Sequence, residues 1–197
     1  EKTAVTETTT TAAETAGSTA TEEKTEGGAL AGKKISVMTP YLTSVTTNQM
    51  AGYIKEDLEA EGAEVFVIDT ANDFAELASR IEDVVSSGTD GIVLVSADPN
   101  QVANQLQDAF DADIPVFGCD SGFIDGMQIN ATSDNYQMGE LIVGYLFDDL
   151  MGGKGTVIAL THRPHPGVVK RCEAFDDIIK EYPDIKLITE QHVPAEQ

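Results

Sequence analysis

Asp120 is the residue in this sequence whose type and position best suit direct chemistry. It follows the apolar run IPVFGC (residues 114–119), which is typical of a buried strand, and it is followed by Ser121 and Gly122. A carboxylate at such a point either forms a turn or binds a ligand. Ionised carboxylate oxygens accept directional, charge-assisted hydrogen bonds from neighbouring hydroxyl groups. Asp120 therefore favours a site for a neutral, polyhydroxylated molecule, with a turn or capping role as the alternative.

The other segments that follow predicted strands carry hydroxyl and amide side chains and contain no Lys, Arg or His. They are residues 40–47, 70–73 and 96–100. Ligands of open α/β sheets bind beyond the carboxyl ends of the strands, where such segments meet. No glycine-rich phosphate loop follows a strand, so nucleotide binding is not supported.

The histidines and cysteines do not form a catalytic or metal-binding pattern. His162 and His165 are three residues apart in HRPH. The neighbouring prolines prevent a helix from presenting both rings on one face, so a polar loop over the binding site is expected. Cys119 and Cys172 are far apart and match no metal spacing. We therefore expect no catalytic residue, no metal site and no cofactor, and a binding protein rather than an enzyme.

The composition is strongly acidic. The chain has 197 residues, with 34 Asp and Glu against 12 Lys and Arg, and a formal net charge of −22. Nucleic-acid binding needs clustered cations, so this balance argues against a nucleic-acid partner and favours a well-solvated surface. No run of about 18 apolar residues is present, so no membrane-spanning helix is predicted.

Residues 1–32 are predicted to be a disordered, Thr- and Glu-rich spacer. Ten of the first 25 residues are threonine, and Val5 is the only large apolar residue in residues 1–28. Such a segment buries too little apolar surface to fold and suits a flexible tether. The start at Glu1, without methionine, indicates a processed or trimmed chain.

From Lys33 onward, short apolar runs alternate with longer segments of helical period. Strands are predicted at residues 34–39, 63–69, 90–96 and 114–120, and helices at 48–62, 73–88 and from near Pro99. Strands that are apolar throughout are buried on both faces, and helices between them make the connections parallel. Residues 33–125 are therefore predicted to form a doubly wound, parallel α/β lobe.

Residues 126–197 continue the alternation as part of a second lobe. Strands are predicted at 127–132, 155–160 and 185–191, and helices at 134–153 and 167–183. The face of the first helix that is expected to point inward carries Met138, Leu141, Ile142, Tyr145 and Leu146. The sequon Asn130-Ala131-Thr132 falls within a predicted strand and carries little weight as a glycosylation site. Because no helix follows the last strand, the second lobe is expected to be incomplete and the chain truncated.

Six motifs from about Lys33 to the end carry a resemblance to a known family: KKISVMTP, GTDGIVLVSADP, IPVFGCDSG, ATSDNYQMGELI, GTVIAL and KRCEAFDDIIKEYPDIK. Together they resemble the periplasmic sugar-binding proteins of the ribose-binding type, the substrate-binding subunits of ABC importers. The resemblance implies a type I periplasmic-binding-protein fold, in which two doubly wound lobes clamp a ligand between them. Residues 33–125 would form the N-terminal ligand-binding lobe, and residues 126–197 a partial second lobe.

The resemblance also implies which residues contact the ligand. The matching or nearest positions are Tyr41, Ser44, Thr46, Thr47, Asp120, Ser121 and Arg171. Asp120 matches a carboxylate that hydrogen-bonds sugar hydroxyls, whereas Ser121 stands where the family commonly has arginine. Arg171 lies close to the position of a second-lobe arginine. The implied ligand is a sugar, and another small polar solute or a signalling molecule is the alternative.

The implied function is that of an extracytoplasmic solute-binding protein that closes on its ligand and delivers it to an ABC permease in the membrane. The spacer suits a lipoprotein, made with a signal peptide and tethered at the cell surface or in the periplasm. A monomer is expected. One alternative is a receptor that only senses its ligand. Another is the effector domain of a lactose-repressor-like regulator, against which the acidic segment before residue 33 argues.

Overall fold

The computed structural model describes residues 28–193, and the predictions for residues 1–27 and 194–197 lie outside this part of the chain. Residues 28–32, which the sequence assigns to the spacer, form a turn against the end of the first helix. The Leu30 N–H donates to the Glu61 carbonyl over 2.9 Å, and the Leu30 side chain packs against a buried cluster. Leu30 supplies this apolar contact, so the packed structure includes the turn.

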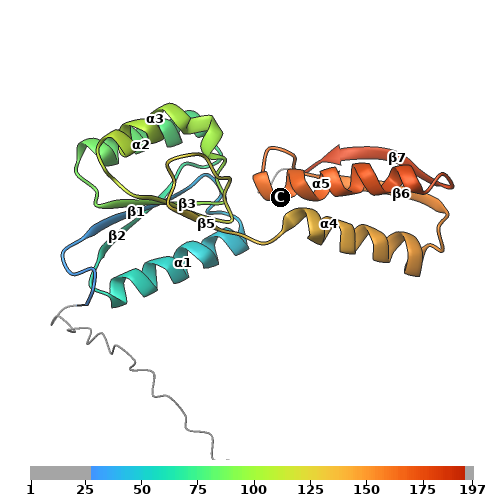
Figure 1. Cartoon of the computed structure of the whole chain (residues 1–197), viewed down its shortest axis with the longest axis horizontal. Coiled ribbons are helices and arrows are strands. Elements are labelled where there is room, and N and C mark those ends of the chain that lie inside the picture. Colours follow the sequence, from blue (N-terminus) through green and yellow to red (C-terminus); the bar gives the residue numbers. More distant parts are fainter. Residues whose placement is uncertain (1–27, 194–197) are drawn as a thin grey trace, which may run out of the picture.

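A five-stranded parallel sheet forms the first half of the structure, with the strand order β2-β1-β3-β4-β5 (Figure 1). The strands are β1 (Lys34–Thr39), β2 (Glu64–Asp69), β3 (Gly91–Val95), β4 (Val116–Cys119) and β5 (Ile129–Ala131). The chain runs outward from β1 to β2 and then returns across β1 to β3, so the sheet is doubly wound as predicted. The order reverses between β1 and β3, which is where open sheets of this kind bind ligands.

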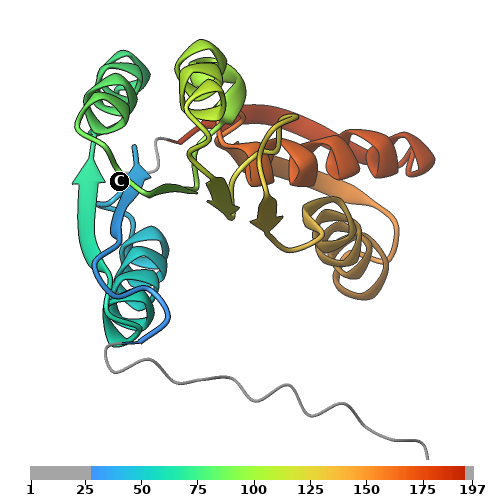
Figure 2. The same ribbon diagram turned by 60° about the vertical axis from the view of Figure 1, so that its left-hand side comes forward.

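Helices cover both faces of this sheet. Figures 1 and 2 show α1 (Val45–Ala60) on one face, and α2 (Phe74–Ser86) and α3 (Ala103–Asp111) on the other. A short 3-10 turn, η1 (Pro99–Val102), leads into α3 and begins with the proline that predicted it. The Asp73 side chain accepts hydrogen bonds from two backbone N–H groups in the first turn of α2 and so caps that helix.

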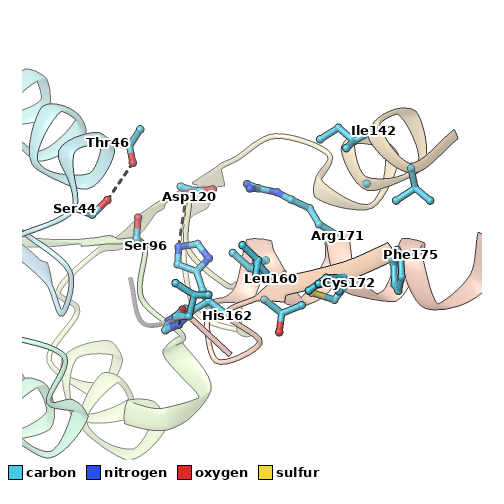
Figure 3. A pocket seen from close by; sticks show the side chains of 18 of the residues that line it. Ser44, Thr46, Ser96, Asp120, Ile142, Leu160, His162, Arg171, Cys172 and Phe175 are labelled. Atoms are coloured by element: carbon cyan, nitrogen blue, oxygen red, sulfur yellow. Dashed lines mark hydrogen bonds and ion pairs between the residues drawn. The ribbon is translucent and has the colours of Figure 1, made fainter. Parts of the chain in front are cut away.

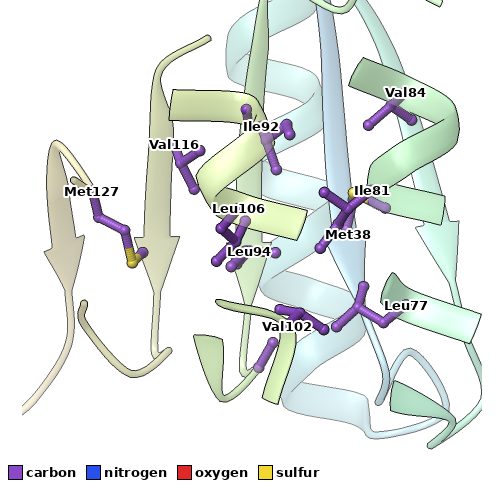
Figure 4. Packing of buried hydrophobic residues seen from close by; sticks show 12 residues of the cluster. Met38, Leu77, Ile81, Val84, Ile92, Leu94, Val102, Leu106, Val116 and Met127 are labelled. Carbon is purple, nitrogen blue, oxygen red and sulfur yellow. The ribbon is translucent and has the colours of Figure 1, made fainter. Parts of the chain in front are cut away.

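Buried side chains form one cluster on each face of the sheet. Figure 4 shows the larger cluster, under α2 and α3, which includes Met38, Leu77, Ile81, Ile92, Leu94, Leu106 and Val116. The smaller cluster lies under α1 and includes Val37, Ala51, Ala63, Val65 and Val95. Successive residues of a strand point to opposite faces, so Val37 and Met38 enter different clusters. Burial on both faces explains why β1 and β3 are rich in apolar residues.

A second, smaller sheet pairs β6 (Gly155–Thr161) in parallel with β7 (Ile185–His192). Two helices pack together beside it (Figure 1): α4 (Asn135–Gly144), which continues into the π-helical turn η2 (Tyr145–Leu150), and α5 (Pro166–Ile178), which continues into the 3-10 turn η3 (Ile179–Glu181). Phe147 is fully buried in this half, with the Phe175 ring 6.1 Å and the Tyr182 ring 5.2 Å away. Among residues 28–193, no helix is both long enough and apolar enough to cross a bilayer.

The inward face of α4 differs from the sequence prediction. Leu141, Ile142 and Tyr145 are expected inside but are 69 %, 59 % and 59 % exposed. Gly139 and Phe147 are buried instead. A Cβ atom at position 139 would lie 2.8 Å from the carbonyl oxygen of Arg171, so α4 and α5 approach each other closely at this glycine. The closeness of the two helices therefore sets the rotation of α4, and apolar periodicity alone does not reveal it.

The first sheet extends beyond the predicted lobe boundary at residue 125. β5 pairs with β4, and the register places Asn130 opposite Gly118. The chain then crosses to the second half through residues 132–134 and enters α4. A short strand between two lobes can belong to either sheet, because its sequence does not specify which neighbour it pairs with.

We predict that Leu94→Ala lowers the free energy of unfolding by about 2–5 kcal/mol, because Leu94 is fully buried in the larger cluster and the alanine leaves a cavity. Leu141→Ala removes the same atoms from an exposed position, and we expect a change below about 0.5 kcal/mol. Urea unfolding of both variants measures the difference. Equal losses would contradict the packing of these two leucines.

Candidate ligand-binding site

A cavity of about 700 Å³ lies between the two halves, where the carboxyl ends of their strands meet (Figure 3). The first half lines it with Tyr41, Ser44, Thr46, Thr47, Ser96 and Asp120. The polar side chains from the second half are Thr161, His162, His165 and Arg171. An apolar wall from the second half includes Ile142, Leu146, Ile158, Leu160 and Phe175. The fold therefore gathers all the site residues that the sequence predicts except Ser121.

The strand ends at this cavity have an unusual backbone. Ser96 follows β3 with φ 56°, and Asp120 follows β4 with φ 48°. This left-handed conformation is unfavourable for residues with a Cβ atom, although aspartate tolerates it better than most. The Ser96 N–H donates to the Cys119 carbonyl over 2.9 Å, and the Asp120 N–H to the Ala131 carbonyl over 2.8 Å. The strand pairing thus continues up to the turn, and the Asp120 side chain lies at the cavity.

Ser121 is not brought to the cavity. Its side chain is buried, and its hydroxyl donates to the Ala97 carbonyl. The Gly122 N–H donates to the same carbonyl over 3.0 Å. The left-handed turn at Asp120 directs the next residue beneath the loop that follows β3, so Ser121 joins two loops instead of facing a ligand.

Hydroxyl groups occupy the first-half side of the cavity in two pairs. The Ser44 and Thr46 hydroxyls lie 3.1 Å apart (Figure 3), and those of Thr47 and Ser96 lie 3.3 Å apart. Ser44 directly precedes α1, but its side chain caps none of the helix N–H groups. Each hydroxyl can both donate and accept a hydrogen bond, which suits a ligand that carries hydroxyl groups itself.

Aromatic contacts across the cavity come from Tyr41 and two histidines that the sequence analysis did not select. The buried Tyr41 ring lies edge-on to His162, with 5.9 Å between ring centroids, and 5.8 Å from His165 in a tilted arrangement. His162 in turn stacks on His192 at 5.1 Å. Two of the three histidines of the sequence therefore contact Tyr41, and the third, His192, stacks on one of them. The HRPH loop was expected to be a polar loop over the site, and it contributes rings that contact the other half.

His165 faces Asp120 through a defined nitrogen. The His165 Nδ1 atom accepts a hydrogen bond from the Gly167 N–H over 3.1 Å, so the proton of the neutral ring lies on Nε2. That Nε2 is 3.9 Å from Asp120 Oδ2. Burial lowers the pKa of His165, and the Asp120 carboxylate partly opposes this shift. The Nε2 side of the ring thus faces the carboxylate without a hydrogen bond to it, so the carboxylate keeps capacity to accept hydrogen bonds from a ligand.

Arg171 extends from α5 toward Asp120 (Figure 3). Its Nε donates to Asn135 Oδ1 over 2.8 Å, and Asn135 is itself buried. Within the described residues, no side chain accepts a hydrogen bond from its terminal Nη atoms. The guanidinium can therefore donate to a ligand while Asn135 fixes its stem.

The site combines a carboxylate acceptor, a guanidinium donor, hydroxyl groups and ring faces. These groups are suited to reversible binding of a small polyhydroxylated molecule through charge-assisted hydrogen bonds. No group of three or more His, Cys, Asp or Glu side chains within residues 28–193 is arranged to hold a metal ion. The sequence signal that could have identified His165 is its place in the loop between β6 and α5, at the same carboxyl-end edge as the other loops.

We predict that acid destabilises the protein through His165. Because its pKa lies below the ordinary value of 6.5, the unfolded chain binds this proton more readily than the folded chain. The contribution of His165 to the free energy of unfolding is therefore fully present above pH 6.5. It is lost as the pH falls from 6.5 toward the pKa that His165 has in the folded chain.

Asp120→Asn should lower the pKa of His165 further, because the carboxylate is the group that raises it. Proton NMR titration of the histidine Cε1–H signals from about pH 8 to about pH 5 measures both effects, and His165→Gln assigns the signal. A His165 midpoint above 6.5 in the unmodified chain would rule out this account.

Arg163 holds the HRPH loop in place. Its guanidinium donates to both carboxylate oxygens of Glu190 on β7, at 2.6 and 3.0 Å, and to both oxygens of Asp176 on α5, at 3.0 and 3.2 Å. The hydrogen bonds that Glu190 accepts from Arg163 and from the Thr161 hydroxyl lower its pKa from 4.5 to about 2. The stabilisation they give is therefore present above pH 4.5 and is lost as the pH falls through about 2.

Glu190→Gln should reduce the stability at neutral pH by about 0.2–1 kcal/mol, the range for exposed ion pairs, and weaken the loss of stability in acid. Glu56→Gln, on the exposed side of α1, is the matched control. Urea unfolding from neutral pH into acid compares the three proteins. If the two variants follow the same pH dependence, Arg163 does not hold the loop through Glu190.

Known proteins resemble this chain over most of its length. The family model described as "Periplasmic binding protein domain" matches residues 35–197. The ribose import binding protein of Bacillus subtilis is 26 % identical over 107 residues, which are 54 % of this chain and 34 % of that protein. The D-apiose import binding protein of Actinobacillus succinogenes is 28 % identical over 166 residues, covering 80 % and 51 %. The chain thus spans from about one third to about half of the length of these relatives.

Solved structures show the same fold. An ABC transporter solute binding protein from Agrobacterium vitis, solved with bound allitol, superposes with a TM-score of 0.73 at 23 % identity and covers 84 % of this chain and 58 % of that one. This agreement confirms the predicted type I periplasmic-binding-protein fold. Since the family model covers nearly all of the described residues, the chain belongs to the periplasmic binding protein domain family.

Proposed function

We propose that this chain is the ligand-binding part of an extracytoplasmic solute-binding protein that captures a sugar or a related polyol for an ABC importer. The observation that carries the proposal is the pairing of Asp120 and Arg171 from opposite halves across one cavity. The similarity to import binding proteins for ribose and for D-apiose supports the class of ligand and the importer.

The recognition chemistry follows from the two charged groups. Asp120 accepts hydrogen bonds from two adjacent hydroxyls of the ligand, and Arg171 donates to hydroxyl oxygens from the other side. The hydroxyl pair of Ser44 and Thr46 supplies neutral hydrogen bonds along the first-half wall. A polyol that spans the cavity satisfies both charges at once, whereas an apolar solute would leave them buried and unpaired.

Two lobes close on the ligand in this proposal. The first lobe comprises residues 33–125 together with β5, and the second lobe begins after residues 132–134, where the chain crosses between the sheets. Because each lobe contributes polar groups to one cavity, a bound ligand stabilises the closed arrangement over an open one. The function is binding and release, without a covalent step.

The remaining parts of the proposal concern location and partners. The protein acts as a monomer outside the cytoplasm, and its permease lies in the membrane. The Thr- and Glu-rich composition of the segment before residue 28 supports a role as a spacer to a lipid anchor. Family membership supports the extracytoplasmic location.

A thermal-shift screen with pentoses, hexoses, pentitols, hexitols and amino acids tests the ligand class. A ligand that binds only the folded state stabilises it by about 2.7 kcal/mol at a hundred times its dissociation constant. We expect at least one sugar or polyol to raise the unfolding midpoint, and Asp120→Ala and Arg171→Ala each to abolish the shift.

Asp125→Ala is the matched control, because Asp125 is an exposed carboxylate in the same loop and does not line the cavity. It should keep the shift. A screen in which only amino acids raise the midpoint would refute the sugar class, and a sugar shift that survives in Asp120→Ala would refute the role of that carboxylate.

A further inference from the structure

Asn130 lies beside the loop that carries Asp120 but does not line the cavity. Its side chain forms two hydrogen bonds with one residue of that loop. Asn130 Oδ1 accepts from the Ser121 N–H over 3.2 Å, and Asn130 Nδ2 donates to the Ser121 carbonyl over 2.7 Å. Only a side-chain amide offers an acceptor and a donor in this geometry, so neither Asp nor Leu reproduces the contact.

The neighbouring strand is built to admit this side chain. Asn130 pairs with Gly118 across β4 and β5. A Cβ atom at position 118 would lie 2.5 Å from Asn130 Oδ1 and 3.0 Å from its Cγ. The glycine therefore leaves the space through which the amide crosses β4 to reach Ser121, and this accounts for a glycine inside a strand.

Two further contacts from the same stretch of chain reach Asp120 itself. The Ala131 carbonyl accepts from the Asp120 N–H over 2.8 Å, and the Thr132 hydroxyl donates to Asp120 Oδ1 over 3.3 Å. Asp120 has the left-handed φ of 48°, which is unfavourable unless the surroundings hold it. Asn130 fixes the residue that follows, and Ala131 and Thr132 fix Asp120, so the turn is held on both sides.

We infer that Asn130 is a positioning residue, which sets the direction of the Asp120 carboxylate in the cavity by holding the backbone of Ser121. The inference rests on the proposed function for its ligand consequences, but the geometry it describes exists without ligand. The inference also gives the asparagine of the Asn130-Ala131-Thr132 sequon a structural role. Its amide nitrogen, to which a glycan would attach, donates a hydrogen bond to the Ser121 carbonyl.

The first test reads the position of Asp120 without any ligand. The His165 ring lies 3.9 Å from the Asp120 carboxylate, and the other charged or titratable groups that act on it are His162 and Arg171. Asn130→Ala leaves those groups in place and releases the turn. We expect the NMR titration midpoint of His165 to fall in Asn130→Ala, in the same direction as in Asp120→Asn.

The control is Asn104→Ala, an exposed asparagine on α3, which should leave the midpoint unchanged. A His165 midpoint in Asn130→Ala equal to that of the unmodified chain, while Asp120→Asn lowers it, would overturn the inference. Gly118→Ala offers a second route should Asn130→Ala fail to fold. Its methyl group displaces the amide from the opposite side, so it should lower the same midpoint.

The second test uses whichever sugar or polyol the thermal-shift screen identifies. Asn130→Ala should weaken its binding by about tenfold, the loss expected when a charge-assisted hydrogen bond is misdirected. In the Asp120→Asn background, whose amide keeps one acceptor oxygen for the ligand, the same change should have little further effect, because Asn130 acts through that carboxylate. Equal losses in both backgrounds would show a general structural role and overturn the inference.

The two tests separate the inference from the proposed function. If no solute in the screen binds, the proposed sugar class fails, yet the His165 titration still decides the role of Asn130. If a sugar binds and Asp120→Ala abolishes binding, but Asn130→Ala changes neither the titration nor the affinity, the proposed function stands and the inference fails.

Discussion

The arrangement of the site depends on Asn135, a buried amide in the first turn of α4. Its Oδ1 accepts a hydrogen bond from Arg171 on α5, and its Nδ2 donates to the Ser133 carbonyl in the crossover over 3.1 Å. Gly167 leaves it room, because a Cβ atom there would lie 3.1 Å from the amide. One side chain therefore joins the crossover to both helices of the second half. Asn135 also fixes the guanidinium of Arg171 that faces Asp120, so the orientation of the second half and the position of Arg171 are coupled.

The two halves contribute different chemistry to one cavity. The first half presents a carboxylate and hydroxyl groups on the rigid edge of a five-stranded sheet. The second half presents Arg171 and the histidine rings. The chain as a whole is strongly acidic, yet the cavity combines one carboxylate with one guanidinium, because local contacts decide the charge of a site while the net charge governs solubility. A neutral polyol fits this balance better than an ion of either sign.

Much of the fold follows from the sequence pattern alone. The apolar strands and the amphipathic helix α2 lie close to their predicted positions, because burial on one or both faces imposes a period that the residues display. Prediction failed where packing between elements decided the outcome. Leu141 points outward because Gly139 allows α4 to pack closely against α5. β5 belongs to the first sheet because it pairs with β4. Neither contact leaves a trace in the local pattern of apolar residues.

For the site, the sequence by itself determined that Asp120 follows a buried strand and that residues with hydroxyl groups follow the neighbouring strands. The carboxyl ends of parallel strands meet at one edge, so such residues converge whatever the details of packing. Only the tertiary structure decided that Ser121 turns inward and that His165 meets Asp120 from the other half. Hydrogen bonds such as those between Asn130 and Ser121 set the direction of a side chain after a left-handed turn. Such bonds, and contacts between lobes that are distant in sequence, join partners that the linear order of residues does not specify.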